Sequence, residues 1–73
     1  MKNKLVLYAN LLKENLKEKG FTLVKQTFNP FSEGVLLTFN RNGREIRSDM
    51  VKVNCEYRLE IKTDTFSVYL FYN

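Results

Sequence analysis

The last third of the chain alternates apolar and polar residues with a period of two. Between positions 51 and 61 every odd residue is apolar and every even residue is polar. The apolar set is Val51, Val53, Cys55, Tyr57, Leu59 and Ile61. Successive side chains of a β-strand point to opposite faces, so the pattern predicts one long strand from Val51 to Ile61 with one buried face. A chain with such a strand must build a sheet that is covered on one side.

A tight turn at Thr63-Asp64 is predicted to return the chain as a strand from Thr65 to Tyr72. The predicted antiparallel pairs are Ile61 with Phe66, Leu59 with Val68, and Tyr57 with Leu70. In this register the inner face is wholly apolar. A shift by one residue would bury Glu56, Arg58 and Glu60 instead, so the hydrophobic pattern specifies the register.

The N-terminal part has the period of an amphipathic helix from Asn3 to Lys19. Asn3 can cap its start, and Gly20 suits the left-handed position just after its end. The main apolar stripe consists of Leu5, Tyr8, Ala9, Leu12 and Leu16. A second stripe, Leu7 and Leu11, lies on another face, beside two glutamates. We interpret this stripe first as the edge of a wide core and second as a contact in a homodimer.

Two further strands are predicted from Phe21 to Phe28 and from Val35 to Arg41. Asn42-Gly43 is typical of a two-residue hairpin turn. The hairpin predicted from it pairs Arg41 with Arg44, Phe39 with Ile46, and Leu37 with Ser48. Together these elements predict a single α+β domain over residues 1–73. One N-terminal helix is expected to pack across a four- to five-stranded antiparallel sheet in two layers.

The composition excludes most catalytic chemistry. The chain has 73 residues, no His and one Cys. Without His there is no Ser-His or Cys-His pair for nucleophilic catalysis. A zinc site would need Cys55 with three carboxylates, so we expect neither a metal nor a cofactor. A single Cys cannot form an internal disulfide, which favours a reducing, cytoplasmic location. No stretch approaches the roughly 18 apolar residues of a membrane span, and no membrane partner is expected.

The outward face of the last two strands is the first candidate binding surface. The predicted register sets Arg58 opposite Tyr69 and Glu56 opposite Phe71. Leu36 and Thr38, with Val24 as a further candidate, are expected on the same side. One helix cannot cover both faces of a sheet, and an uncovered patch with two aromatic rings indicates a binding surface. The alternative is a cross-strand stack of Arg58 on Tyr69 beside one exposed Phe.

Positive charge is the second candidate feature, since the net charge is +4. Residues 1–25 carry six Lys against two Glu, whereas residues 53–73 carry two basic against three acidic side chains. The predicted hairpin adds Arg41, Arg44 and Arg47. Guanidinium groups donate paired hydrogen bonds in one plane, which suits phosphates or acidic protein surfaces. The predicted partner-binding residues are Arg41, Arg44, Arg47, Arg58, Tyr69 and Phe71.

One pattern and one resemblance point to nucleases. Asp49 with Glu60-Ile61-Lys62 matches the acids and lysine of metal-dependent nucleases, in which the acids hold Mg²⁺. The stretch from residue 11 to residue 26 resembles the opening helix and strand of HicA-type toxin ribonucleases, which implies an arrangement similar to double-stranded-RNA-binding domains. Those enzymes need a His at the next strand and a C-terminal helix. This sequence has no His and ends in a strand pattern.

These observations favour a non-enzymatic protein-interaction module that uses the exposed sheet face and the arginine hairpin. Eight Asn and eight Lys against one Ala match the bias of AT-rich codons. A phage or mobile-element inhibitor of host machinery, for instance of a nuclease, is the concrete form expected. The alternative is a basic nucleic-acid-binding module that uses the Lys-rich helix side and the three hairpin arginines. A metal-dependent nuclease is the remote alternative.

Overall fold

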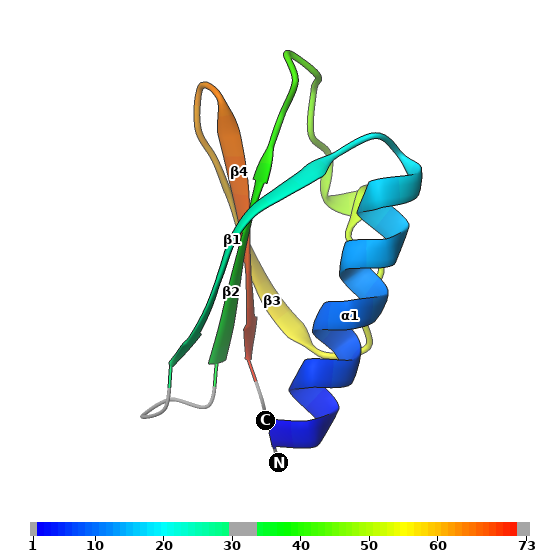
Figure 1. The fold of residues 1–73 in the computed structure, drawn as a ribbon, viewed down its shortest axis with the longest axis vertical. Coiled ribbons are helices and arrows are strands. Elements are labelled where there is room, and N and C mark those ends of the chain that lie inside the picture. Colours follow the sequence, from blue (N-terminus) through cyan, green and yellow to red (C-terminus); the bar gives the residue numbers. More distant parts are fainter. Residues whose placement is uncertain (1, 30–33, 72–73) are drawn as a thin grey trace.

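One helix lies against one face of a four-stranded antiparallel sheet in the computed structural model, which describes residues 2–29 and 34–71 (Figure 1). The helix α1 is Lys2–Glu18, and a short 3-10 helix, η1, is Ser48–Met50. The strands are β1 (Thr22–Asn29), β2 (Gly34–Asn40), β3 (Glu56–Ile61) and β4 (Thr65–Phe71). Their order in the sheet is β1-β2-β4-β3. The predicted two-layer α+β fold is confirmed. In the part of the chain that the structure describes, no helix combines the length and apolar character needed to cross a bilayer.

The C-terminus of α1 adopts the glycine-based cap that the sequence predicts. Gly20 has a φ of +92°, which a residue with a Cβ adopts only with strain. Its N–H donates to the carbonyl of Lys17 at 3.0 Å, and the N–H of Phe21 donates to Leu16 at 2.9 Å. These two bonds form a Schellman motif, and the buried Phe21 and Leu16 make the apolar pair that accompanies it. The cap directs the chain from α1 straight into β1.

The core lies between α1 and the two central strands. The helix contributes Leu5, Ala9, Leu12 and Leu16, and the sheet contributes Val35, Leu37, Phe39, Phe66, Val68 and Leu70, all buried. The ring of Phe66 stacks on Phe39 with centroids 5.2 Å apart and meets Phe21 edge-on at 5.2 Å. Burial of this apolar surface is the main source of stability in so short a chain.

The hairpin of β3 and β4 has the predicted register. Ile61 pairs with Phe66, Leu59 with Val68, and Tyr57 with Leu70. The predicted turn is closed by the N–H of Lys62, which donates to the carbonyl of Thr65 at 2.8 Å. Ile61 lies at the end of the sheet and is 48% exposed, although its position in the register is on the inner face.

The Asn42-Gly43 turn is present, but the strand predicted after it is wrong. Both residues have positive φ, +56° and +71°, and the N–H of Arg44 donates to Arg41 at 3.1 Å. Residues 44–47 then leave the sheet. The partners of β2 are β1 and β4, so Phe39 lies between Leu23 and Phe66 rather than opposite Ile46. Both edges of β2 are thereby occupied, and Ile46 is buried without entering the ladder.

The long strand predicted from Val51 to Ile61 is a strand only from Glu56 onward. Pairing begins at Glu56, which lies opposite Phe71, the last residue of β4. Residues 51–55 nevertheless keep the predicted inward side chains, because Val51 is buried and Val53 and Cys55 pack on the core.

The preferred interpretation of the second helical stripe is also wrong. Leu7 is 55% exposed and Leu11 is 47% exposed. The sheet reaches only the side of α1 that carries Leu5, Ala9, Leu12 and Leu16, so a residue on the opposite side cannot join the core.

Candidate functional site

The face of the sheet turned away from α1 is the candidate binding surface, called here the outer sheet face. Its members are Lys25 and Thr27 of β1, Leu36 and Thr38 of β2, Glu56, Arg58 and Glu60 of β3, and Ser67, Tyr69 and Phe71 of β4. Within residues 2–29 and 34–71 no helix or strand lies against it (Figure 1). Val24 lies at the bulge where β1 shifts register and is 58% exposed. The exposed face thus includes aromatic, aliphatic and charged side chains.

An aromatic and arginine row lies on this face at the C-terminal end of β4. The rings of Tyr69 and Phe71 are stacked, with centroids 4.4 Å apart and an angle of 9° between planes. The guanidinium carbon of Arg58 lies 5.7 Å from the Phe71 ring centroid, within the range of a cation–π contact. Arg58 is opposite Tyr69 in the ladder, as predicted, but its side chain lies over Phe71. Three side chains of the predicted site are therefore brought together.

Gly34 provides the space in which the Tyr69 ring lies. A Cβ added to Gly34 would come within 2.2 Å of Cε1 of Tyr69, closer than any real contact. The ring therefore lies directly on the backbone of β2 and extends toward β1. There the side-chain amide of Asn29 donates to the Tyr69 hydroxyl at 3.4 Å. The aromatic pair is thus supported from three strands, and its position is set before any partner binds.

The remainder of the outer sheet face is polar and of mixed charge. A shallow hollow of about 340 Å³ lies beside Tyr69, lined among others by Lys25, Leu36 and Arg58. At its floor the hydroxyls of Thr38 and Ser67 are 3.1 Å apart and share a hydrogen bond. Lys62 and Glu60 form an exposed ion pair at 3.5 Å. Basic and acidic groups therefore both lie beside the aromatic row.

Arg41 joins two turns of the fold and is not a free cation at a hairpin tip. Its guanidinium donates to the carbonyls of Lys62 at 2.7 Å and Thr63 at 3.4 Å, and to Arg44 at 3.1 Å. Its backbone N–H donates to Asp64 at 2.9 Å. These bonds attach the 41–44 turn to the β3–β4 turn.

Arg44 is engaged with the end of the helix. Its guanidinium donates to the carbonyl of Lys19 and lies 4.4 Å above the Phe21 ring. The Asn42 amide donates to the carbonyl of Gly20 at 3.0 Å. A cation beside the last carbonyls of a helix is favourable, so this turn closes the C-terminus of α1. Arg47 differs, since it is exposed and faces Asp49 at 3.7 Å. The structure does not unite the three arginines into one free cluster.

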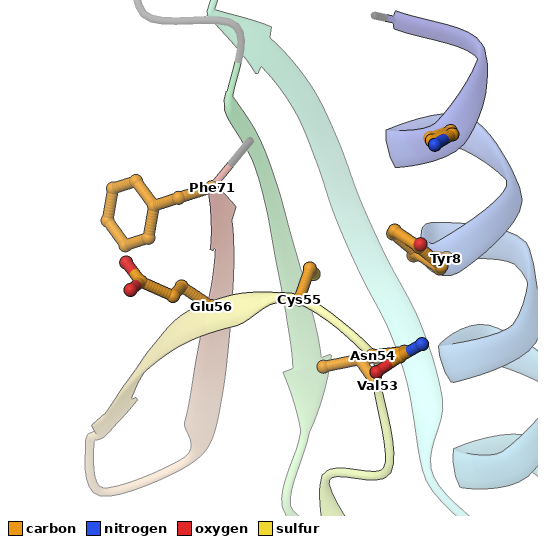
Figure 2. Close-up of a pocket in the computed structure, with 7 residues that line it drawn as sticks. Tyr8, Val53, Asn54, Cys55, Glu56 and Phe71 are labelled. Atoms are coloured by element: carbon orange, nitrogen blue, oxygen red, sulfur yellow. The ribbon is translucent and has the colours of Figure 1, made fainter. Parts of the chain in front are cut away.

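A second hollow of about 500 Å³ opens between α1 and the segment before β3 (Figure 2). Figure 2 shows Phe71 and Glu56 projecting on one side, Tyr8 facing from α1 on the other, and Cys55 between them. The polar groups do not converge on one point, as they would around a bound small molecule. Burial raises the pKa of the Cys55 thiol above its ordinary value, which disfavours the reactive thiolate.

The residues of the nuclease pattern have separate partners. Asp49 faces Arg47 at 3.7 Å, and Glu60 faces Lys62 at 3.5 Å. Among the residues that the structure describes, no three His, Cys, Asp or Glu side chains gather as metal ligands would. Glu60 lies on the outer sheet face, whereas Asp49 belongs to η1. The two acids of the nuclease pattern therefore lie in different parts of the fold.

The strand predicted from Val35 to Arg41 leaves out Gly34, so its role was missed. The signal was present as a Gly directly before a β-branched strand residue, because Gly within a strand often marks a close approach of another group. The contact of Arg44 with the C-terminal end of α1 was also missed, because Lys19 and Arg44 are far apart in the sequence and no local pattern predicts that they meet. Comparison of the chain with protein-family models, with curated proteins and with solved structures finds no match.

Proposed function

We propose that this protein is a non-enzymatic binding module that recognises another protein through its outer sheet face. The observation that carries the proposal is the row of Arg58, Phe71 and Tyr69. Aromatic and arginine side chains are the residues most enriched at the energetic centres of protein interfaces. A module of this type acts by occupying a surface of its partner, and an inhibitor of host machinery is one form of such an activity.

The charges around this row favour a protein over a nucleic acid. Two acids, Glu56 and Glu60, stand on the same face as Arg58 and Lys25. A surface that tracks a phosphate backbone combines aromatic rings with a consistently positive groove. Arg41 and Arg44 donate to backbone carbonyls within the chain, which reduces their capacity to serve as phosphate ligands. A mixed rim around an apolar centre is the usual composition of a protein interface.

Affinity capture from cell extract, before and after nuclease treatment, tests this proposal. We expect the wild-type chain to capture a protein that resists nuclease, and Phe71→Ala to lose it. Phe28→Ala is the control, because Phe28 is an exposed aromatic residue of β1, 48% exposed, whose position opposite Val35 puts it on the other face. The control should capture as much as the wild type.

Two outcomes contradict the proposal. Recovery of nucleic acid alone, with all protein lost after nuclease, would favour the nucleic-acid-binding alternative. Equal loss of capture in Phe28→Ala and Phe71→Ala would show that the outer sheet face has no special role. Circular dichroism of both variants separates loss of binding from loss of fold.

A further inference from the structure

The side of α1 that faces away from the sheet carries an apolar pair that the fold does not use. Leu7 and Leu11 are one turn apart and 55% and 47% exposed. They lie opposite the buried stripe that begins at Leu5. Within the described residues no other element covers them, and the proposed function involves the other face of the molecule.

Charged residues flank this pair in an ordered way. Lys4 lies three residues before Leu7, and Glu14 lies three residues after Leu11. Both side chains are exposed. No ion pair among residues 2–29 and 34–71 includes either of them. The face is therefore positive at one end, apolar in the middle and negative at the other end.

This arrangement is self-complementary under a two-fold axis. When two copies of α1 cross antiparallel with the axis at position 9, residue i of one copy lies level with residue 18 − i of the other. Leu7 then lies level with Leu11, and Lys4 lies level with Glu14. Each copy contributes the same contacts, so one interface gains two apolar pairs and two ion pairs.

We propose that the chain forms a weak antiparallel homodimer through this face of α1. A foreign amphipathic helix could bury the leucines, but only a second copy automatically provides the opposite charge at both ends in register. One helix face buries less than the roughly 800 Å² per partner of a standard interface, so the dimer belongs to the transient class. The two copies interact through i, i+4 ridges at an interaxial distance of about 8–10 Å.

Dimerisation would make the protein bivalent. In one chain α1 and the outer sheet face are on opposite sides of the sheet (Figure 1). The dimer would therefore direct its two outer sheet faces away from each other. A partner that presents two copies of its own surface would then be held with higher avidity than a single site provides. This consequence depends on the proposed function, whereas the dimer itself does not.

Sedimentation velocity of the pure chain tests the dimer without any partner. The measurement covers about 20 µM to about 1 mM, where an interface of this size should dissociate, at an ionic strength that screens the net charge of +4. We expect the weight-average mass to rise toward that of two chains. Leu11→Asp should remain a monomer throughout, because a charge would replace the central apolar contact.

A charge-exchange series decides the register. Lys4→Glu and Glu14→Lys should each raise the dimer dissociation constant by at least about threefold, since each creates two like-charge pairs. The double variant K4E/E14K should return it to near the wild-type value. Lys4→Glu adds an acid to the first turn of α1, which favours the helix, so its effect cannot be attributed to unfolding.

The proposal is overturned if the wild type stays monomeric up to the highest concentration. It is equally overturned if Leu11→Asp dimerises like the wild type, or if the double variant is no better than the single ones. Failure of the capture experiment with an intact dimer would reject the proposed function alone.

Discussion

Gly34 is the residue that determines where the Tyr69 ring lies. In Gly34→Ala the new methyl group would occupy the position of Cε1 and displace the ring, because the two would be 2.2 Å apart. The ring can rotate toward solvent, so we expect the chain to fold with a loss of about 1–2 kcal/mol of stability. The stack on Phe71 should be lost. Near-ultraviolet circular dichroism and ring-current shifts in NMR spectra report that stack directly.

The control for this substitution is Thr38→Ala, on the same strand and face. It removes one hydroxyl bond to Ser67 and leaves the aromatic pair untouched. If Gly34→Ala keeps the wild-type aromatic spectrum, the ring is not positioned by the glycine. If Gly34→Ala also keeps its captured partner, preorganisation of Tyr69 has no part in binding.

Arg44 is expected to affect stability rather than recognition. In Arg44→Ala the carbonyl of Lys19 loses its donor and Phe21 loses its cation. Together these contacts should contribute about 1 kcal/mol, measured as a shift of the urea midpoint at constant slope. Arg47→Ala is the control, because Arg47 forms an ion pair with Asp49 in which each side chain is 69% exposed. Such an exposed pair should contribute almost nothing to stability. Equal midpoints for the two variants would contradict this role for Arg44.

At the level of elements, the central strands should contribute more stability than the edges. Leu37 is fully buried on β2, between β1 and β4, and Leu37→Ala should cost about 2–5 kcal/mol and come close to unfolding the chain. Leu59 lies on the edge strand β3 and is only partly buried, so Leu59→Ala should cost about half as much. Chemical denaturation of both variants checks the order. A larger loss for Leu59→Ala would mean that β3 is not an edge.

The sequence pattern correctly predicted the elements whose contacts join residues that are close together in the sequence. The register of β3 and β4 follows from strict alternation, because a shift by one residue exposes Leu59 and buries its charged neighbours, and from a two-residue turn. The cap at Gly20 involves only residues of the last helical turn and the two residues after it, so the local sequence is sufficient to predict it. Both are confirmed.

The partners of β2 could not be predicted in the same way. The Asn42-Gly43 turn would permit a hairpin, but β1 and β4 occupy both edges of β2 and provide Leu23 and Phe66 opposite Phe39. The choice between these partners depends on packing of distant segments, which a turn motif does not contain. The same limit applies to the candidate site. Its aromatic pair was predictable from the register, whereas the support from Gly34 depends on ring placement.

At the level of the whole molecule, the basic and aromatic surfaces lie on different sides. Beside β1, on the side of the helix, Lys13 and Lys17 flank an apolar hollow of about 320 Å³ that no acidic side chain lines. Lys13 also donates to Gln26 at 2.9 Å, which holds its ammonium group at the edge of the sheet. The outer sheet face has acids among its bases. Non-specific attraction of polyanions should therefore occur at the first surface and partner recognition at the second.

Titration with a twenty-nucleotide oligothymidine strand tests this separation. Contacts of the two lysines with about two phosphates predict weak binding that falls about sevenfold between about 50 mM and about 200 mM salt. Lys13→Gln with Lys17→Gln should abolish this binding, whereas Phe71→Ala and the exposed control Lys52→Gln should leave it nearly unchanged. When a single-stranded nucleic acid binds along an aromatic surface, its bases stack on the aromatic rings. A large loss of oligonucleotide affinity in Phe71→Ala would therefore identify the outer sheet face as a nucleic-acid surface and reject the protein-binding proposal.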